Sequence, residues 1–212
     1  KSGYIILVEG NIDVVSLHQA GFDSAVASLG TSLTPEQARL LSRYTGEVVI
    51  AYDADEAGKK ASQRAITLLE KLEMKVRVLT VQGAKDPDEY LKAKGPDAFR
   101  NLLERSEDHI EYRLQTITDK YDLSSDEDKV AFLREATDLI AGLPGAVERE
   151  VYAMRAASMC GVSPDAVGSE VARRRKKKLA AAKKTAEREL FRPEKAAQPK
   201  TGGIRYENPR SA

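Results

Sequence analysis

The 212-residue sequence has one cysteine, two histidines and no tryptophan. A single thiol, Cys160, cannot form an internal disulfide or a cysteine-based zinc cluster, which is typical of proteins in a reducing cytoplasm. No apolar run approaches the roughly 20 residues needed to cross a membrane, and residues 1–10 lack a signal-peptide pattern. These absences exclude disulfide-rich secreted domains, cysteine-based zinc modules and membrane spans. Because Lys1 leads at once into a strand-like run, we expect the chain to be part of a longer protein.

The net charge of +1 conceals a strong asymmetry along the chain. Residues 171–212 hold 14 of the 34 Lys and Arg residues but only 4 of the 33 Asp and Glu residues. The body is therefore acidic and the tail basic. An acidic body cannot grip nucleic acid by charge alone, so any such binding needs metal ions or a basic surface elsewhere.

Short apolar runs alternate with helical patterns in the first part of the chain. Strands are expected at residues 4–8, 25–28, 48–52 and 75–81, the last near an edge, and helices at 13–20, 35–45 and 56–73. This alternation predicts an α/β domain with a mainly parallel, four-stranded sheet. Only helical patterns follow, at 88–94, 97–105, 110–120, 126–141, 146–159 and from Pro164 onward. We therefore expect an α/β domain over 1–87, a helical subdomain over 88–178 and a basic, disordered linker over 179–212.

Acidic side chains follow three of the predicted strands. These are Glu9 and Asp13 after the first, Asp53 and Asp55 after the third, and Asp86 and Asp88 after the fourth. The carboxyl ends of parallel strands meet at one edge of a sheet, so these groups should converge there. Neighbouring carboxylates raise each other's pKa, and a divalent cation relieves that repulsion. Oxygen-only ligands favour Mg²⁺ or Mn²⁺.

A simpler interpretation of the same acids is helix capping. Asp is a preferred N-cap residue, and Asp55 and Asp88 each stand where a helix is expected to begin. Both interpretations stay open on spacing alone. His18 and His109 are isolated in helical patterns, where packing is favoured over ligation. The basic run 173–178 either contacts DNA phosphates or is a solvated helix end leading into the linker.

Four segments resemble, in order, motifs of the DnaG-type bacterial primases. They are residues 8–14 (VEGNIDV), 27–34 (ASLGTSLT), 52–58 (YDADEAG) and 85–91 (KDPDEYL). Glu9 with Asp53 and Asp55 also resembles the Toprim signature, which primases share with topoisomerases, nucleases and recombination proteins. Asn11-Ile12 replaces the Tyr-Met of many members and Ala54 replaces a Gly, but no carboxylate is lost. The resemblance implies a Toprim-type, Rossmann-like fold.

The resemblance also implies a function. Such enzymes are DNA-directed RNA polymerases that make short RNA primers on a single-stranded DNA template from nucleoside triphosphates, in the bacterial cytoplasm at the replication fork. Glu9, Asp53 and Asp55 would be the catalytic metal ligands, with Mg²⁺ or Mn²⁺ as cofactor. Asp13, Asp86 and Asp88 would complete the site. Lys85, Lys59 and Arg64 would meet phosphate, although Lys59 and Arg64 fit solvated helix charges equally well.

The resemblance further implies parts that these residues do not contain. A zinc-binding domain and a basic subdomain would precede this segment, and a domain that binds the replicative helicase would follow the basic tail. We therefore expect the isolated chain to bind metal but to synthesise primers poorly. The alternatives are a Toprim-type metal-dependent nuclease and a non-catalytic scaffold module.

Overall fold

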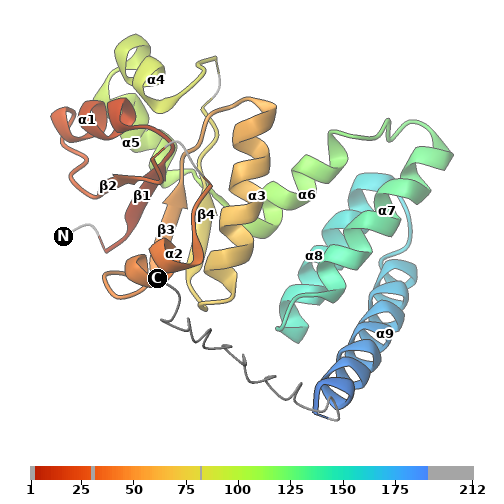
Figure 1. Ribbon diagram of the computed structural model, residues 1–212. Coiled ribbons are helices and arrows are strands. Elements are labelled where there is room, and N and C mark those ends of the chain that lie inside the picture. Colours follow the sequence, from red (N-terminus) through yellow and green to blue (C-terminus); the bar gives the residue numbers. More distant parts are fainter. Residues whose placement is uncertain (1–2, 30–31, 82, 191–212) are drawn as a thin grey trace, which may run out of the picture. The chain divides into compact units, whose positions relative to one another are not determined.

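The computed structural model of the chain describes residues 3–29, 32–81 and 83–190 (Figure 1). The chain separates into two compact units, residues 1–136 and 137–212, and each is considered by itself. This division falls later than the expected boundary after residue 87. Within the described residues, no helix combines the length and the apolar character that a bilayer crossing requires.

The first unit is built on a five-stranded sheet in the order β2-β1-β3-β4-β5. The strands are β1 (Ile5–Val8), β2 (Ala25–Ala27), β3 (Glu47–Ile50), β4 (Lys75–Val78) and β5 (Glu107–Asp108). The first four are parallel, as the alternation of strand and helix patterns predicts. The continuous apolar runs are strands buried on both faces, with β1 and β3 almost fully shielded from solvent.

The fifth strand corrects two predictions. β5 pairs antiparallel with β4, so a strand does occur beyond residue 87, and the sheet has five strands instead of four. β4 was expected near an edge and does lie next to one, since only the short β5 pairs with Arg77 and Val78 on its outer side. β5 has only two residues, both charged and exposed, and such a segment carries no strand pattern in the sequence.

Helices cover both faces of the sheet. In the first unit they are α1 (Asn11–Gln19), α2 (Pro35–Leu41), α3 (Glu56–Glu70), α4 (Pro87–Lys94), α5 (Pro96–Glu104) and α6 (His109–Thr118). One core joins Leu7 and Ile50 of the sheet to the buried face of α3 and to Ala38 of α2. The other joins Ile6 and Val49 to α1, α4 and α5. Alternate strand residues thus pack against opposite helical layers.

Local sequence signals set several helix ends. Thr34 caps α2 and Gln37 reaches back to the Thr34 N–H, which confirms the predicted capping box. The helices expected to open a separate subdomain instead pack on the sheet, with Leu91 of α4 and Phe99 of α5 buried in its second core. Phe99 also meets Phe22 edge to face, with ring centroids 5.0 Å apart. α4 and α5 therefore belong to the α/β unit.

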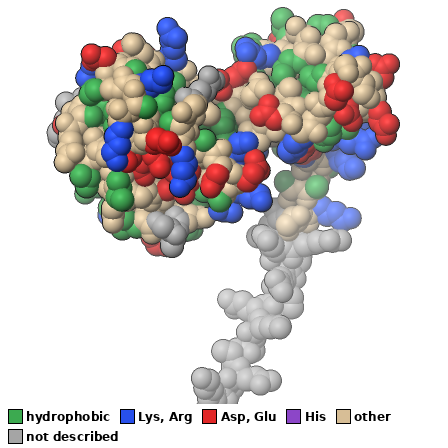
Figure 2. Space-filling model, turned by 90° about the horizontal axis from the view of Figure 1, so that it is seen from above, with side chains coloured by type: hydrophobic (Ala, Val, Ile, Leu, Met, Phe, Trp, Pro, Cys, Tyr) green, Lys and Arg blue, Asp and Glu red, His purple; other side chains and the backbone are tan. Residues whose placement is uncertain are grey.

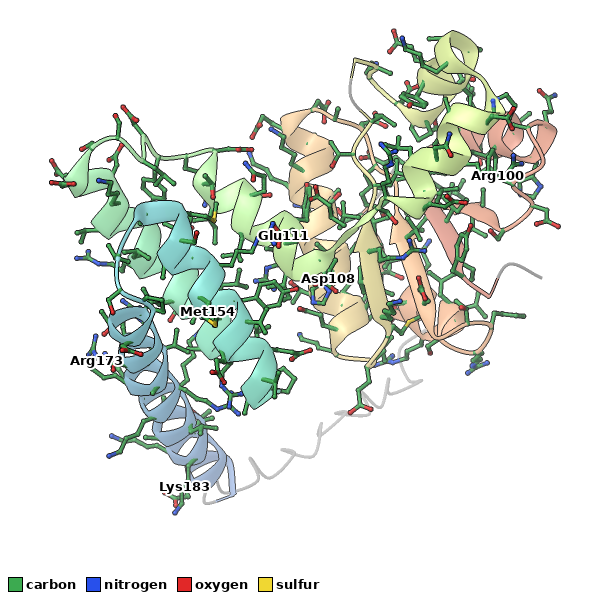
Figure 3. The ribbon with its side chains drawn as sticks, turned by 180° about the vertical axis from the view of Figure 1, so that it is seen from behind. Arg100, Asp108, Glu111, Met154, Arg173 and Lys183 are labelled. Carbon is green, nitrogen blue, oxygen red and sulfur yellow. The ribbon has the colours of Figure 1, made fainter. Side chains whose placement is uncertain are left out.

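The last helices are α7 (Asp126–Ala141), α8 (Ala146–Cys160) and α9 (Pro164–Leu190). α9 remains helical through residues 179–190, which were expected to be linker; residues 191–212 lie outside the described residues. Part of the basic run binds its own unit. Arg175 donates to the Leu143 carbonyl at 2.7 Å, and Lys178 pairs with Asp138 at 2.9 Å. Arg173 and Lys183 project from α9 (Figure 3).

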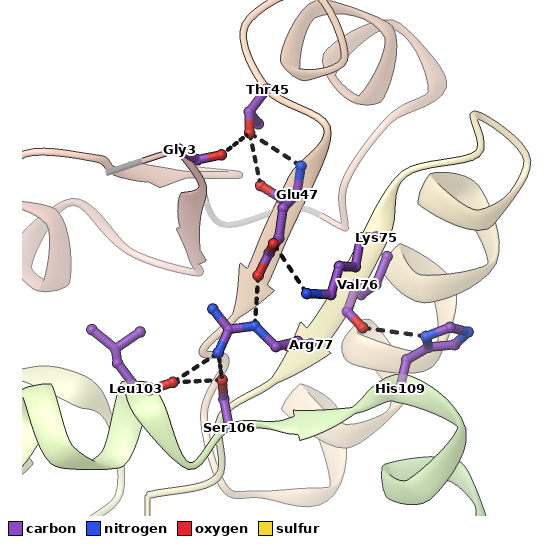
Figure 4. Close-up of polar contacts among 9 residues, drawn as sticks. All are labelled: Gly3, Thr45, Glu47, Lys75, Val76, Arg77, Leu103, Ser106 and His109. Carbon is purple, nitrogen blue, oxygen red and sulfur yellow. Dashed lines mark hydrogen bonds and ion pairs between the residues drawn. The ribbon is translucent and has the colours of Figure 1, made fainter. Parts of the chain in front are cut away.

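A polar network links β3, β4 and the segment before β5 (Figure 4). Arg77 Nε lies 2.7 Å from Glu47 Oε1, and Arg77 Nη1 donates to the Leu103 carbonyl and to Ser106 Oγ at 3.0 and 2.6 Å. The guanidinium, held half-buried, uses its planar fork to satisfy several acceptors at once. This arrangement holds the end of α5 against the sheet.

His109 forms a second link across the sheet edge. Its Nε2 lies 2.9 Å from Glu70 Oε1, and its Nδ1 lies 3.2 Å from the Val76 carbonyl oxygen. Both ring nitrogens face acceptors, which only the protonated ring can satisfy together. Although burial acts to lower the pKa of His109, its hydrogen bond to Glu70 and the charges of Asp108 and Glu70 raise it above the usual value.

This geometry predicts a pH-dependent stability. The folded pKa of His109 is raised, so its contribution is fully present below the unfolded value of about 6.5 and is lost as pH rises through the folded pKa. His109→Gln should cost about 2 kcal/mol of unfolding free energy at pH 6, the scale of a charged hydrogen bond, and little at pH 9. Urea denaturation across this range measures it. His18→Gln is the control, and an equal loss at both pH values would contradict the prediction.

Candidate metal centre at the carboxyl edge of the sheet

The structure brings the acidic turns to one edge of the sheet. Glu9 follows β1, Asp53 lies just beyond β3, and Asp86 precedes α4. A backbone hydrogen bond of 3.0 Å from the Ala54 N–H to the Lys85 carbonyl joins the second and third turns. Figure 2 shows Asp and Glu side chains gathered on a face of the first unit, with Lys and Arg side chains beside them. The predicted convergence of these turns is therefore present.

Glu9 and Asp53 form the closest part of the site. The Asp53 N–H donates to Glu9 Oε1 at 3.3 Å, which ties the end of β1 to the end of β3. Gly58, buried in the first turn of α3, permits this approach. A Cβ on Gly58 would stand 2.1 Å from the Asp53 carbonyl oxygen and 2.9 Å from Glu9 Oε1. Only a residue without a side chain fits there.

The electrostatics show that these carboxylates act on one another. Burial and the charges of Glu9, Asp13, Asp86 and Asp55 raise the pKa of Asp53 to about 6. Burial also raises the pKa of Glu9; the Asp53 N–H and Arg64 oppose this rise, while Asp55 and Asp13 add to it. Negative charge is thus concentrated at Asp53 beyond what the protein itself neutralises.

Two of the acids do cap helices. Asp55 Oδ1 accepts the Gly58 N–H at 2.7 Å at the start of α3, and Asp86 Oδ1 accepts the Glu89 N–H at 2.8 Å at the start of α4. The capping interpretation is right for Asp55, but at α4 the cap is Asp86 and not Asp88. A carboxylate offers about four lone-pair sites, so capping with one oxygen leaves capacity for a metal.

Asp13 and Asp88 connect α1 to α4. Asp13 is 7% exposed, and its two oxygens accept the N–H groups of Asp88 and Gly10, each at 3.3 Å. Asp88 accepts a hydrogen bond from Ser16 and pairs with Lys92 at 2.6 Å. Burial raises the pKa of Asp13, whereas the Lys92 and Ser16 hydrogen bonds lower that of Asp88. Both acids therefore have structural partners already.

The three candidate phosphate contacts do not form one cluster. Lys59 pairs with Glu56 at 3.0 Å on α3, as expected of a solvated helix charge. Lys85 contributes its backbone, which contacts Ala54 and the Glu89 carboxylate. Arg64 lines a pocket together with Glu9. Of the three, the structure places Arg64 in a pocket with a predicted metal ligand.

The acidic side chains at this edge have the chemistry of a divalent-cation site but are not a preformed cluster. Among the side chains that the structure describes, no three His, Cys, Asp or Glu residues are grouped closely enough to hold a metal ion. Glu9 and Asp53, whose charges act on one another, offer oxygen atoms only and carry raised pKa values. These features fit a hard cation such as Mg²⁺ at Glu9 and Asp53, with Asp55 two residues beyond Asp53 along the turn.

Sequence reasoning missed the pocket between Glu9 and α3. It has a volume of about 170 Å³ and is lined by Glu9, Ser28, Ser32, Tyr52, Ala57, Ala61 and Arg64. Tyr52 ends an apolar run that predicts a buried strand; it is buried, at 4% exposed, but lies just beyond the end of β3. An apolar run gives no sign of where its hydroxyl points. Gly30 and Thr31, within the second motif, lie outside the described residues.

Two segments of the chain match known protein families. Residues 6–91 match the Toprim-like family, and residues 110–165 match the DnaB-helicase binding domain of primase. The DNA primase of Clostridium acetobutylicum is 37% identical over 163 residues, covering 77% of this chain and 27% of that protein. The chain thus spans about a quarter of the length of this curated relative.

Solved structures show the same likeness. A DNA primase domain from Pseudomonas aeruginosa is 31% identical, with a TM-score of 0.63 over 79% of this chain and 54% of that one. A DnaG primase catalytic domain bound to single-stranded DNA is 28% identical, with a TM-score of 0.64 over 78% and 53%.

The helicase-binding match corrects one prediction. Helicase binding was expected only beyond the basic tail, whereas the matching segment runs from α6 to the start of α9, inside this chain. The four motifs gave no hint of this, because they all lie before residue 92. With the Toprim-like match and the primase relatives, these findings show that the chain belongs to the DnaG-type bacterial DNA primases, as a segment holding the Toprim domain and the helical region after it.

Proposed function

We propose that this chain supplies the metal-binding catalytic centre of a DNA primase, which joins ribonucleotides into short RNA primers on single-stranded DNA. The observation that carries the proposal is the Glu9–Asp53 pair at the carboxyl edge of the sheet, where the pKa of Asp53 is raised to about 6. Charge concentrated beside another carboxylate is the state that a divalent cation relieves. The primase relatives support nucleotidyl transfer as the reaction.

Each residue has a part in this proposal. Glu9 and Asp53 hold Mg²⁺ or Mn²⁺, and Asp55 joins them while it caps α3. Asp13, Asp86 and Asp88 fix α4 beside the site, and the charges of Asp13 and Asp86 add to the negative field at Asp53. When bound, the cation would lower the pKa of the attacking 3′-hydroxyl and stabilise the pyrophosphate leaving group. Nucleoside triphosphates would reach the site with the same cations.

The template is proposed to be single-stranded DNA, which a related catalytic domain binds in its solved structure. Residues 1–170 carry more acidic than basic side chains, so this segment is poorly suited to hold the DNA phosphates by itself. We propose that the remainder of the protein supplies most of the positive surface. The isolated chain should then bind metal but prime weakly.

Primer synthesis tests the proposal. Glu9→Gln keeps the size of the side chain and removes its charge, so we expect the Mg²⁺-dependent rate of ribonucleotide incorporation to fall about 100-fold or more in the full-length protein. Labelled ribonucleotides on a single-stranded template report the rate, and Glu73→Gln, a change on an exposed turn, is the control.

Two results would count against primase activity. If Glu9→Gln incorporated ribonucleotides at the wild-type rate, Glu9 would not be a catalytic metal ligand. Cleaved DNA ends in Mn²⁺, without incorporation of ribonucleotides, would assign the site to a nuclease instead.

We also propose that the replicative helicase contacts the segment matched over residues 110–165. Three apolar side chains of α8 are exposed to solvent. Val147, and Val151 one turn further on, are 74% and 54% exposed, and Met154, labelled in Figure 3, is 54% exposed. Exposed apolar side chains at this spacing suit a protein partner. Val147→Asp with Val151→Asp should weaken helicase binding about tenfold or more in a pull-down titration. Leu40→Asp, on α2, is the control, and equal binding by all three proteins would contradict the contact.

A further inference from the structure

The pocket beside Glu9 contains a buried hydroxyl group without a partner. Tyr52 lines this pocket, and its Oη has no hydrogen-bond partner among the residues that the structure describes. A buried polar group that makes no hydrogen bond lowers stability, and such exceptions call for an explanation. A ligand that accepts a hydrogen bond from Tyr52 would provide one.

The rest of the lining indicates the chemical class of that ligand. Arg64 brings a permanent positive charge, and Ser28 and Ser32 bring hydroxyl groups. Donors therefore outnumber the single carboxylate, Glu9. A pocket of about 170 Å³ has room for one or two phosphate groups but not for a whole nucleotide. The charges of Arg64 and Glu9 offset each other, so the set of hydrogen-bond donors is what favours an oxyanion here.

Glu9 would repel an anion unless its charge is compensated. The Arg64 guanidinium acts on Glu9 and lowers the energy of its ionised form. A divalent cation at Glu9 and Asp53 would do so more strongly, since it carries two positive charges. Oxyanion binding in the pocket and cation binding at the pair should therefore strengthen each other.

We propose that this pocket binds the phosphate groups of the nucleotide substrate or of the pyrophosphate product, with Tyr52 and Arg64 as the donors. The inference rests on the proposed nucleotidyl transfer and names the place of its phosphate groups. It assigns Arg64 a ligand contact and Tyr52 a role that its position at the end of an apolar run did not suggest.

The test is calorimetric titration of the 212-residue chain with pyrophosphate in Mg²⁺. Tyr52→Phe deletes only the hydroxyl, and Arg64→Gln removes the guanidinium with its charge but keeps a polar side chain. We expect each variant to bind pyrophosphate about tenfold more weakly, as befits one charge-assisted hydrogen bond. Lys60→Gln, an exposed change on the same helix but outside the pocket lining, should bind like the wild type. The melting temperature of Tyr52→Phe, measured alongside, shows whether this variant folds like the wild type.

Further titrations distinguish substrate phosphate from product pyrophosphate, and the phosphate pocket from the proposed metal centre. Competition by a ribonucleoside triphosphate would assign the pocket to the substrate, and its failure, with pyrophosphate still bound, to the product. The pocket is overturned if the wild type does not bind pyrophosphate, or if both variants bind it within twofold of the wild type, even when Mg²⁺ binds normally. The chain could also bind pyrophosphate through Tyr52 and Arg64 without binding Mg²⁺. That result would support the phosphate pocket and contradict the metal centre.

Discussion

Replacing Gly58 with alanine should destabilise the chain by about 3 kcal/mol or more. The added Cβ would lie 2.1 Å from the carbonyl oxygen of Asp53 and 2.9 Å from its carbonyl carbon. Both atoms are backbone, so no side-chain rotation relieves the clash, and β3 and α3 would have to move apart. In an ordinary helix the same change stabilises by about 1 kcal/mol. The expected sign is therefore reversed, and urea denaturation measures it.

The chain provides a matched control for this change. Gly168 lies within α9, and a Cβ placed on it would meet nothing within 4 Å. Gly168→Ala should therefore stabilise or be neutral. Gly58→Ala should also weaken Mg²⁺ binding about tenfold or more, because the displaced Asp53 backbone carries the N–H that holds Glu9. A Gly58→Ala chain with wild-type stability and wild-type Mg²⁺ affinity would show that this contact does not shape the site.

The sheet and its acidic edge were predictable because two strong signals coincide there. The apolar runs around Leu7 and Val49 are short and continuous, as two-sided burial in a parallel sheet demands. Acids follow these runs directly, so topology alone brings Glu9 and Asp53 to one edge. Spacing did not predict which acids cap helices and which have oxygens left for a metal ion. Capping by Asp55 and Asp86 depends on which N–H each oxygen reaches, and that is set by the local backbone.

The features that the sequence did not predict depend on tertiary contacts. β5 is a strand only because the backbone of Glu107 and Asp108 meets the outer side of β4. α4 and α5 show the pattern of any amphipathic helix, and Phe99 does not indicate whether it packs on a sheet or on other helices. Asp13 is predicted as a further metal ligand, and the sequence gives no sign that its oxygens also accept the N–H groups of Asp88 and Gly10. Its negative charge still acts on Asp53.

Asp53→Asn should stabilise the metal-free chain while it abolishes metal binding. The folded pKa of Asp53 is about 6 and its unfolded value is 3.8, so the folded state binds more protons between these values. Wild-type stability should therefore fall as pH rises from about 4 to about 6 and stay reduced at pH 7. Because the carboxylate is only half-buried, solvent screening limits the penalty to about 1–2 kcal/mol. The neutral amide escapes this penalty.

Urea denaturation at pH 7, in EDTA and in Mg²⁺, reveals both effects together. In EDTA the variant should be more stable than the wild type by that amount. In Mg²⁺ the wild type should gain about 2.7 kcal/mol at a concentration 100 times its dissociation constant, and the variant should gain almost nothing. In Mg²⁺ the wild type should therefore become at least as stable as Asp53→Asn. The control is Asp23→Asn, an exposed change before β2, which should have the stability of the wild type in both conditions. A variant that is less stable in EDTA would mean that Asp53 is held by favourable contacts and that its charge is not in surplus. A variant that gains stability from Mg²⁺ as the wild type does would place the cation elsewhere.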